Sequence, residues 1–264
     1  MLRSVWTKTL WEGRNGIVLW SVALAGVSLM YALFYPSINQ ESFAQAMESF
    51  PEALMLAFGW DDLTSAAGYL GSTVFGLLAP ILMIVFAIGL GTRAIAGDEE
   101  AGTLDLLLAH PVSRARVVLE RALALAVSLT VATLAVFGAI VAARGVAELD
   151  ALSVGAIAAA SLHLLLLALT FGTLALALGA IGGSRSLALS GAAIVAVLGY
   201  FGNTIARQVD ATRWLATLSP FRYYEGGAPL RNGLQVGDAT VLLVASALFV
   251  AVAVVALGRR DVGA

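Results

Sequence analysis

"LGSTVFGLLAPILMIVFAIGLGT", residues 70–92, decides the fold class, because none of these residues carries a charge. About 20 apolar residues in a helix cross the roughly 30 Å hydrocarbon core of a bilayer. The run is apolar throughout, whereas the strands of a membrane barrel alternate apolar and polar residues. Similar runs recur along the chain, and with their flanking turns they predict spanning helices at about 16–35, 70–96, 119–143, 151–181, 187–206 and 239–258. We therefore expect an all-α polytopic membrane protein with six transmembrane helices.

The overall composition agrees with that class. The chain is 60% hydrophobic and 12% charged, whereas about a quarter of the residues of an average soluble domain are charged. It contains no cysteine, which excludes disulfides, thiolate metal sites and cysteine nucleophiles. The largest loop is too short to fold alone. Residues 1–264 are therefore expected to form a single transmembrane domain.

The distribution of basic residues predicts the orientation. Ten of the fifteen Lys and Arg residues fall in the segments on the side of the N-terminus. Because basic residues are enriched in cytoplasmic loops, both termini are predicted to be cytoplasmic. The outer loops are then about 36–69 and 207–238.

Two further helices are predicted outside the spans. Residues 2–14, "LRSVWTKTLWEGR", set apolar against basic positions, which is typical of an amphipathic helix on the inner membrane surface. In the first outer loop an apolar stripe at helical spacing predicts a helix in the outer interface; its members are Phe43, Ala46, Met47 and Phe50. The last outer loop contains "LSPFRYYEGGAPLRNGL", residues 218–234, whose glycines and prolines disfavour one continuous helix.

Several kinds of chemistry are excluded by the residues. No acid falls inside the charge-free run of a predicted span, since Glu120 lies in the turn that precedes the third run, 122–143. This argues against a proton- or sodium-coupled carrier, because such carriers keep an intramembrane carboxylate. Lys8 is the one lysine, and no glycine-rich loop precedes it, so the chain lacks a phosphate-binding loop. No carboxylate pair or Ser–His constellation is evident. We therefore predict no catalytic residue and no metal site, and any ATP must be bound by another polypeptide.

The most highly charged segment is residues 97–121, "GDEEAGTLDLLLAHPVSRARVVLER". Gly102 is predicted to end the extended second span after Glu100, and Thr103 to cap a new short helix by accepting a backbone N–H. One face of that helix collects leucines at i, i+3 and i+4, namely Leu104, Leu107 and Leu108. From these residues alone the segment is either an ordinary inner loop with leucines lying on lipid or a helix that docks on a partner.

The end of this short helix is also predicted locally. Pro111 stops it and pushes His110 toward extended geometry. Ser113 is a plausible cap for a helix that starts near Arg114 and continues into the third span.

Residues 97–121 resemble the cytoplasmic loop of type-2 ABC transporter permeases. That loop carries an acidic pair, Gly-Thr, a leucine cluster, and then Pro-Val-Ser-Arg leading into a basic helix. The resemblance extends to residues 218–234 and to the closing pair Arg259-Arg260, and with six spans it covers essentially the whole chain. One mild departure is Glu120, which precedes the basic residue Arg121.

The resemblance implies a multi-pass permease of the prokaryotic cytoplasmic membrane, which pairs as a homodimer in the lipid bilayer. Each copy would bind a separate ATPase subunit, so two ATPase copies, with their ATP and Mg²⁺, complete the complex. The permease is not an enzyme by itself, holds no cofactor and binds no nucleic acid. The helix at about Thr103 to His110 would be the coupling helix that enters the ATPase. The coupling residues expected are Glu99, Glu100, Gly102, Thr103, Leu104, Leu107, Leu108, Pro111, Ser113 and Arg114.

The resemblance also implies alternating access along a path at the dimer interface, lined by the second and fifth spans. The residues offered there are mostly apolar: Phe75, Met83, Phe86, Tyr200, Phe201 and Asn203. An exported hydrophobic or amphiphilic substrate is expected. His163 could line the path or carry a proton, or it could be a neutral imidazole that hydrogen-bonds a neighbouring helix. Asn203 has the same two interpretations.

Two other functions compete with an exporter. The chain could be a membrane-embedded assembly or enzyme subunit whose loop docks a partner other than an ATPase. It could also be a secondary carrier. A neighbouring gene that encodes an ATPase with a phosphate-binding loop would favour the permease.

Overall fold

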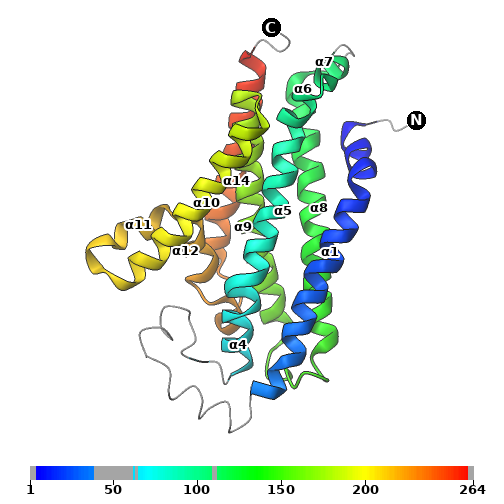
Figure 1. Cartoon of the computed structure of the whole chain (residues 1–264). Coiled ribbons are helices and arrows are strands. Elements are labelled where there is room, and N and C mark those ends of the chain that lie inside the picture. The colour runs from blue at the N-terminus through cyan, green and yellow to red at the C-terminus, as the bar shows by residue number, and fades with distance from the viewer. Residues whose placement is uncertain (1–3, 39–61, 63–64, 109–111, 261–264) are drawn as a thin grey trace.

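The computed structural model describes residues 4–38, 62, 65–108 and 112–260 (Figure 1). In these residues there is no strand, and six helical segments are long and apolar enough to cross a membrane. They are α1 (Val5–Ile38), the segment Ala66–Glu100, α8 (Arg114–Ala143), α9 (Val154–Gly182), α10 (Arg185–Gln208) and α14 (Val236–Arg259). The predicted all-α fold with six spans is confirmed.

The second span is a series of shorter pieces. It runs through α4 (Ala66–Ser72), the π-helix η1 (Val74–Leu78), α5 (Ala79–Thr92), the π-helix η2 (Arg93–Gly97) and α6 (Asp98–Glu100). A π-turn inserts one residue into a helix. The first π-turn has a local cause, because Pro80 has no N–H to offer the carbonyl four residues earlier. The span therefore continues from one end of the bundle to the other with two changes of register.

Helix α9 lies at the centre of the bundle. It packs against α5, α8, α10 and α14, and 72% of its most apolar window is buried, against 22% for α1, α10 and α14. Glycines let its backbone approach α5 closely. A Cβ on Gly91 would lie 2.1 Å from the carbonyl oxygen of Gly172. The core forms around this contact, with Leu164, Leu167 and Phe171 fully buried on α9.

Helix α1 differs from the prediction at the N-terminus. The amphipathic segment expected on the inner surface is not a separate element, since α1 continues without a break through residues 5–16 into the first span. A helix of 34 residues is about 51 Å long, which exceeds the roughly 30 Å hydrocarbon core. The residues predicted to lie along the surface therefore form the end of a long helix (Figure 1).

The two loops that are predicted to be outer differ in how much of each the structure describes. The predicted interfacial helix around Phe43 and Phe50 lies outside the described residues. The last outer loop consists of a 3-10 turn at Asp210–Thr212 followed by α11 (Arg213–Leu218), α12 (Pro220–Glu225) and α13 (Pro229–Asn232). It is not one continuous helix, as its glycines and prolines predicted.

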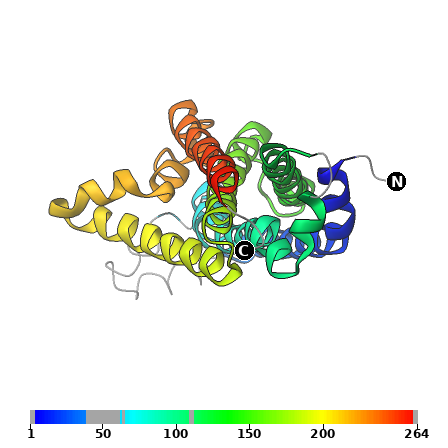
Figure 2. The ribbon, with the colours of Figure 1, turned by 90° about the horizontal axis from the view of Figure 1, so that it is seen from above.

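Helices α10 and α11 form an arm at one side of the molecule. In Figures 1 and 2, α10 leans away from the bundle and α11 returns toward it, while α1 lies at the opposite edge. Helix α12 then packs against α9, α10 and α14. The fifth span is thus attached to the bundle at its start and through α12, and most of its apolar side chains are not covered by this subunit.

Candidate functional site

The segment 97–121 lies at one tip of the bundle, at the same end as the start of α1 and the end of α14 (Figure 1). Gly102 turns the chain with φ +67°, a left-handed conformation that glycine adopts without steric cost. Helix α7 (Thr103–Leu108) follows. The predicted stop at Gly102 is confirmed.

The polar caps of this loop agree in part with the prediction. Ser113 Oγ accepts the N–H of Arg116 at 3.3 Å and caps α8, as expected. Thr103 acts differently, because its hydroxyl donates to the carbonyl oxygen of Asp98 at 3.0 Å. It therefore closes the turn onto the end of the second span.

The leucine face of α7 points into the subunit. Leu104 is 1% exposed and belongs to a buried cluster with Ile95, Val117 and Leu257. Leu107 packs half-buried against the same cluster. These side chains fix α7 on its own helices, while Gly102 and Thr103 are exposed. The side chain of Leu108, and His110 and Pro111, lie outside the described residues.

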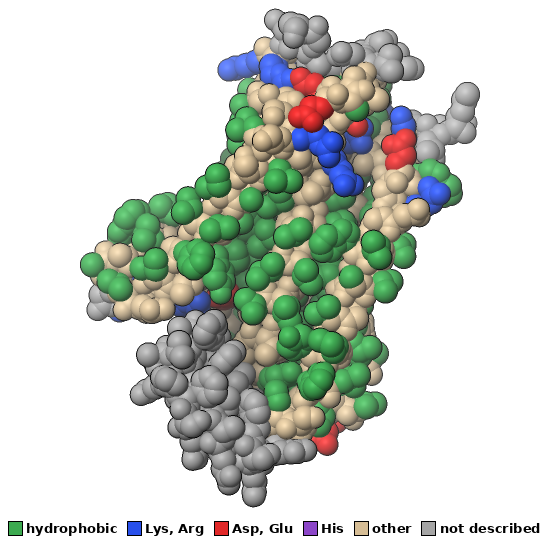
Figure 3. Space-filling view, viewed as in Figure 1, with side chains coloured by type: hydrophobic (Ala, Val, Ile, Leu, Met, Phe, Trp, Pro, Cys, Tyr) green, Lys and Arg blue, Asp and Glu red, His purple; other side chains and the backbone are tan. Residues whose placement is uncertain are grey.

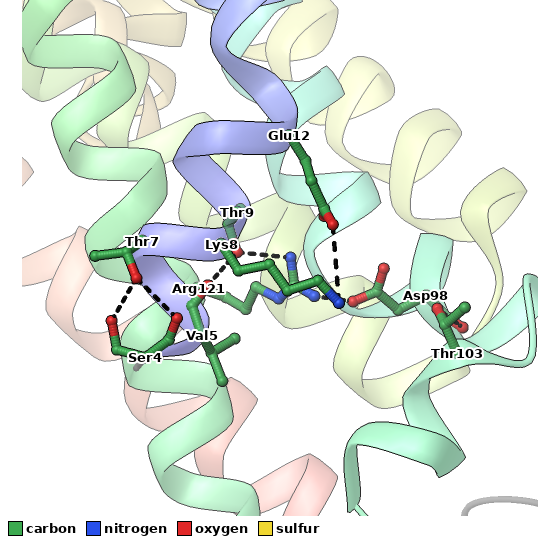
Figure 4. Close-up of polar contacts among 9 residues, drawn as sticks. All are labelled: Ser4, Val5, Thr7, Lys8, Thr9, Glu12, Asp98, Thr103 and Arg121. Atoms are coloured by element: carbon green, nitrogen blue, oxygen red, sulfur yellow. Dashed lines mark hydrogen bonds and ion pairs between the residues drawn. The ribbon is translucent and has the colours of Figure 1, made fainter. Parts of the chain in front are cut away.

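Charged side chains gather at this tip, above a largely apolar surface (Figure 3). The residues Asp98, Glu99 and Glu100, here called the acidic triplet, form α6. Asp98 pairs with Arg121 of α8. Arg121 also donates from Nη1 to Thr9 Oγ1 of α1 at 2.8 Å (Figure 4). The first acid therefore fastens the loop to the third span and, through arginine, to the first.

Glu99 pairs with Arg260, which follows α14. The same guanidinium donates from Nη1 to the carbonyl oxygen of Ala180, near the end of α9, at 3.0 Å. Arg114 donates from Nη1 to the carbonyl oxygens of Leu257 and Arg260, so it caps the end of α14. The second acid thus fastens the loop to the fourth and sixth spans.

Glu100 reaches the fifth span. Its Oε1 accepts the backbone N–H of Arg185, the first residue of α10, at 2.8 Å, and its Oε2 lies 4.0 Å from Arg185 Nε. A carboxylate at a helix N-terminus is stabilised by the unpaired N–H groups and the helix dipole.

A further carboxylate holds the first span. Glu120 Oε2 accepts the N–H groups of Val5 and Trp6 at 2.5 and 3.1 Å, and Glu120 Oε1 accepts Arg116 Nε at 2.8 Å. The residue that departs from the resembling pattern is therefore the cap of α1.

Of the predicted coupling residues, Glu99, Glu100 and Arg114 belong to this charged network. Asp98, Glu120 and Arg121 belong to the same network and were not predicted as site residues. The sequence signal that could have identified them is their charge, next to the ends of apolar spans.

The predicted path residues differ in their surroundings within the single subunit. Phe75, Met83 and Phe86 are buried in the core, and Phe86 stacks on Trp20 with ring centroids 5.3 Å apart. Phe201 is 57% exposed on α10. A groove of about 220 Å³ lies between α10 and α11, but its lining includes none of the predicted path residues; it is lined in part by Val195, Leu198, Gly202, Leu215 and Leu218.

The polar path candidates are inside the bundle. His163 is fully buried, and its Nδ1 lies 3.1 Å from the carbonyl oxygen of Tyr223 in α12. This contact matches the interpretation of a hydrogen-bonded imidazole between helices. Asn203 is 5% exposed, and half-buried Tyr200 packs edge-on against Phe221.

The last loop before α14, predicted to be outer, also holds a carboxylate that is paired with an arginine. Glu225, at the end of α12, lies 3.2 Å from Arg207 Nη1. Burial raises the pKa of Glu225 above its ordinary value, and the charge of Arg207 lowers it in part.

Comparison with known proteins agrees with this architecture. Residues 12–262 match the family described as ABC-2 family transporter protein. The probable ABC transporter permease protein NosY of Pseudomonas aeruginosa is 42% identical over 81 residues. That match covers 28% of this chain and 30% of the relative, so it spans less than a third of the relative's length. Because the family match covers most of the chain, the protein belongs to the ABC-2 family and is a transmembrane subunit of an ABC transporter.

Proposed function

We propose that the chain is the permease subunit of an ATP-driven exporter that moves a hydrophobic or amphiphilic substrate. It works as a homodimer, and each copy docks one separate ATPase subunit on the loop 97–121. The observation that carries this proposal is the placement of α7. Its leucine face is anchored on the subunit, with Leu104 buried, while Gly102 and Thr103 face outward at the tip of the bundle. A short helix that is anchored on the subunit and exposed where it begins, at Thr103, suits a rigid contact with a soluble partner.

The proposed energy source is ATP bound by a partner, because the chain itself lacks a phosphate-binding loop. A phosphate-binding loop needs a lysine after glycines, and Lys8 sits instead in the helix α1, paired with Glu12 at 3.8 Å. ATP and Mg²⁺ would therefore belong to the partner. When two ATPase subunits close around ATP, they displace the two copies of α7, and the attached spans move around a central path.

The proposed substrate class is supported by the exposed side chains of the fifth span. Phe201 and several apolar side chains of α10 are exposed in the single subunit, whereas the histidine of the fourth span is buried and hydrogen-bonded inside the bundle. A path between two such faces would favour apolar or amphiphilic molecules, because an unpaired charge there would lose its hydration.

The test uses an exposed position, since Leu104→Asp would disturb the fold of the subunit itself. Ala101→Arg adds a large charged side chain beside α7, where Ala101 is exposed. The permease would be co-expressed and co-purified with a candidate ATPase subunit that carries a phosphate-binding loop. We expect Ala101→Arg to abolish co-purification while the permease keeps its thermal stability.

The matched control is Val146→Arg, because Val146 is 77% exposed in the turn after α8, at the opposite end of the bundle (Figure 1). It should leave co-purification unchanged. Undiminished binding by Ala101→Arg, together with undiminished ATP hydrolysis, would show that the ATPase docks elsewhere.

A further inference from the structure

We propose that Asp98, Glu99 and Glu100 are three separate positioning residues, each of which sets the position of the cytoplasmic loop relative to different spans. Their role in passing the motion of α7 to the membrane helices rests on the proposed function. The positioning itself does not, and it can be tested on the permease alone.

Helix geometry explains how three neighbours reach three directions. The acidic triplet is a single helical turn, and successive side chains on a helix point about 100° apart. Three consecutive carboxylates therefore fan out around the axis instead of sharing one partner. The chain places a basic residue in each direction: Arg121, Arg260 and Arg185.

The partners belong to different spans. Asp98 reaches α8 through Arg121, which also bonds Thr9 of α1. Glu99 reaches Arg260 after α14, which also bonds the carbonyl of Ala180 in α9.

Glu100 accepts the N–H that begins α10. The triplet itself ends the second span. All six spans thus meet these three carboxylates, either directly or through one arginine.

The ion pairs are only partly buried, which suits contacts that hold the loop in place and can still break when it moves. The two side chains of the Glu99–Arg260 pair are 22% and 24% exposed, and those of the Glu100–Arg185 pair are 46% and 51% exposed. Partly exposed pairs are screened by water and are individually weak. Loss of a single pair should therefore loosen one connection without unfolding the bundle.

The experiment measures each connection separately. Because the chain contains no cysteine, introduced cysteine pairs carry spin labels at unique positions. Ala101→Cys, directly after the triplet, is combined in turn with Leu119→Cys on α8, Arg259→Cys on α14 and Leu189→Cys on α10. All four positions are exposed. Pulsed electron paramagnetic resonance then gives three distance distributions for the permease in lipid nanodiscs.

We expect each substitution to act on one distance. Asp98→Ala should broaden the distribution of distances between positions 101 and 119. Glu99→Ala should broaden the 101–259 distribution, and Glu100→Ala should broaden the 101–189 distribution. In each variant the other two distributions stay narrow. Arg260→Ala should also broaden the 101–259 distribution, and adding Glu99→Ala to it should broaden that distribution no further, because Arg260→Ala already removes the contact with Glu99.

The matched control is Glu12→Ala, because Glu12 is an acid at the same end whose pair with Lys8 is more than half exposed. It should leave all three distributions narrow. The proposal is overturned if a single triplet substitution broadens all three distributions alike, or if none of the three broadens any.

A second measurement separates this inference from the proposed function. In the complex with its ATPase, Arg93→Cys replaces Ala101→Cys as the common labelled position, because Arg93 is exposed in η2 just before the triplet and a label at position 101 would block the proposed docking surface. A non-hydrolysable ATP analogue should shift all three distances in the wild type. Glu100→Ala should lose the 93–189 shift and keep the other two. If nucleotide shifts no distance in the wild type while the selective broadening above is observed, the positioning role stands and the ATP-driven mechanism fails.

Discussion

Gly183 ends α9 in the left-handed region, with φ +63°, and its missing side chain leaves room for the Glu99–Arg260 pair. A Cβ at this position would lie 2.3 Å from Arg260 Nη2 and 2.7 Å from Glu99 Oε1. Two independent features therefore require glycine at this position: the left-handed backbone and the space that the ion pair occupies.

We expect Gly183→Ala to destabilise the permease. The left-handed backbone costs an L-residue roughly 1–2 kcal/mol, and displacement of the ion pair adds to this. Thermal unfolding in nanodiscs measures the loss. Gly138→Ala is the control, because Gly138 is an exposed helical residue on α8 with no neighbour within 4 Å of an added Cβ. It should be neutral or stabilising by up to about 1 kcal/mol, and equal effects of the two changes would contradict the assignment.

The Glu225–Arg207 pair gives a pH-dependent prediction. Burial raises the folded-state pKa of Glu225, so the folded protein holds this proton to higher pH than the unfolded chain. The contribution of Glu225 to stability is thus fully present below its unfolded pKa and falls as pH rises through the folded pKa. Arg207→Ala removes the charge that opposes the shift, so it should destabilise the protein more at pH 7.5 than at pH 4.5 (thermal unfolding).

Glu225→Gln in the Arg207→Ala background is the control for that measurement. It replaces the ionisable group with a neutral amide, so the difference between the two pH values should shrink. A pH dependence of Arg207→Ala that persists unchanged in the double variant would assign the effect to another group.

At the level of single residues, local signals were predictable and distant partners were not. The turn at Gly102 and the cap by Ser113 follow from sequence neighbours, and both were predicted. The partners of the acidic triplet lie 23, 161 and 85 residues away along the chain, and no spacing rule connects them. The leucine face of α7 was recognised by its period, but a period cannot tell whether the face covers its own helices or a partner.

Among the elements, α1 shows how tertiary contacts can set where a helix begins. The sequence predicts a surface segment at residues 2–14 and a separate span from about residue 16, which implies an interruption between them. The structure has none. The first turn is held from outside the helix, by Glu120 of α8, whose carboxylate accepts two of its free N–H groups.

We expect Glu120→Ala to fray this end of α1. Loss of a charged acceptor leaves two backbone N–H groups unpaired, at a cost of about 1–3 kcal/mol. Amide hydrogen exchange over residues 5–12 should accelerate, while the middle of α1 stays protected. Glu12→Ala, on the exposed face of the same turns, should leave exchange unchanged; if the two substitutions act alike, the cap is not what orders this segment.

At the scale of the whole molecule, the number and class of the spans were predictable because the bilayer thickness sets them. The arrangement of the spans was not predictable, because the apolar surface of a helix can face either lipid or another helix. Helix α9 became the centre through its glycines and the complementary contact at Gly91. Helix α10, which is less apolar in sequence than α9 but still apolar enough to span a membrane, leans outward (Figure 2).

The exposed face of α10 leads to a prediction for the assembled transporter. If two copies meet along their fifth spans, as proposed, each interface residue faces its own counterpart near the two-fold axis. Phe201 is 57% exposed on this face, and the chain contains no cysteine. Oxidation of Phe201→Cys in membranes should therefore give a covalent dimer on a non-reducing gel.

The control for the dimer is Leu134→Cys, since Leu134 is 60% exposed on α8, in a span that the proposal assigns to lipid. It should remain monomeric under the same oxidation. Equal cross-linking of both variants would indicate random collision in the membrane. Cross-linking of Leu134→Cys alone would place the two-fold axis at the third span and remove the support for a path between the fifth spans.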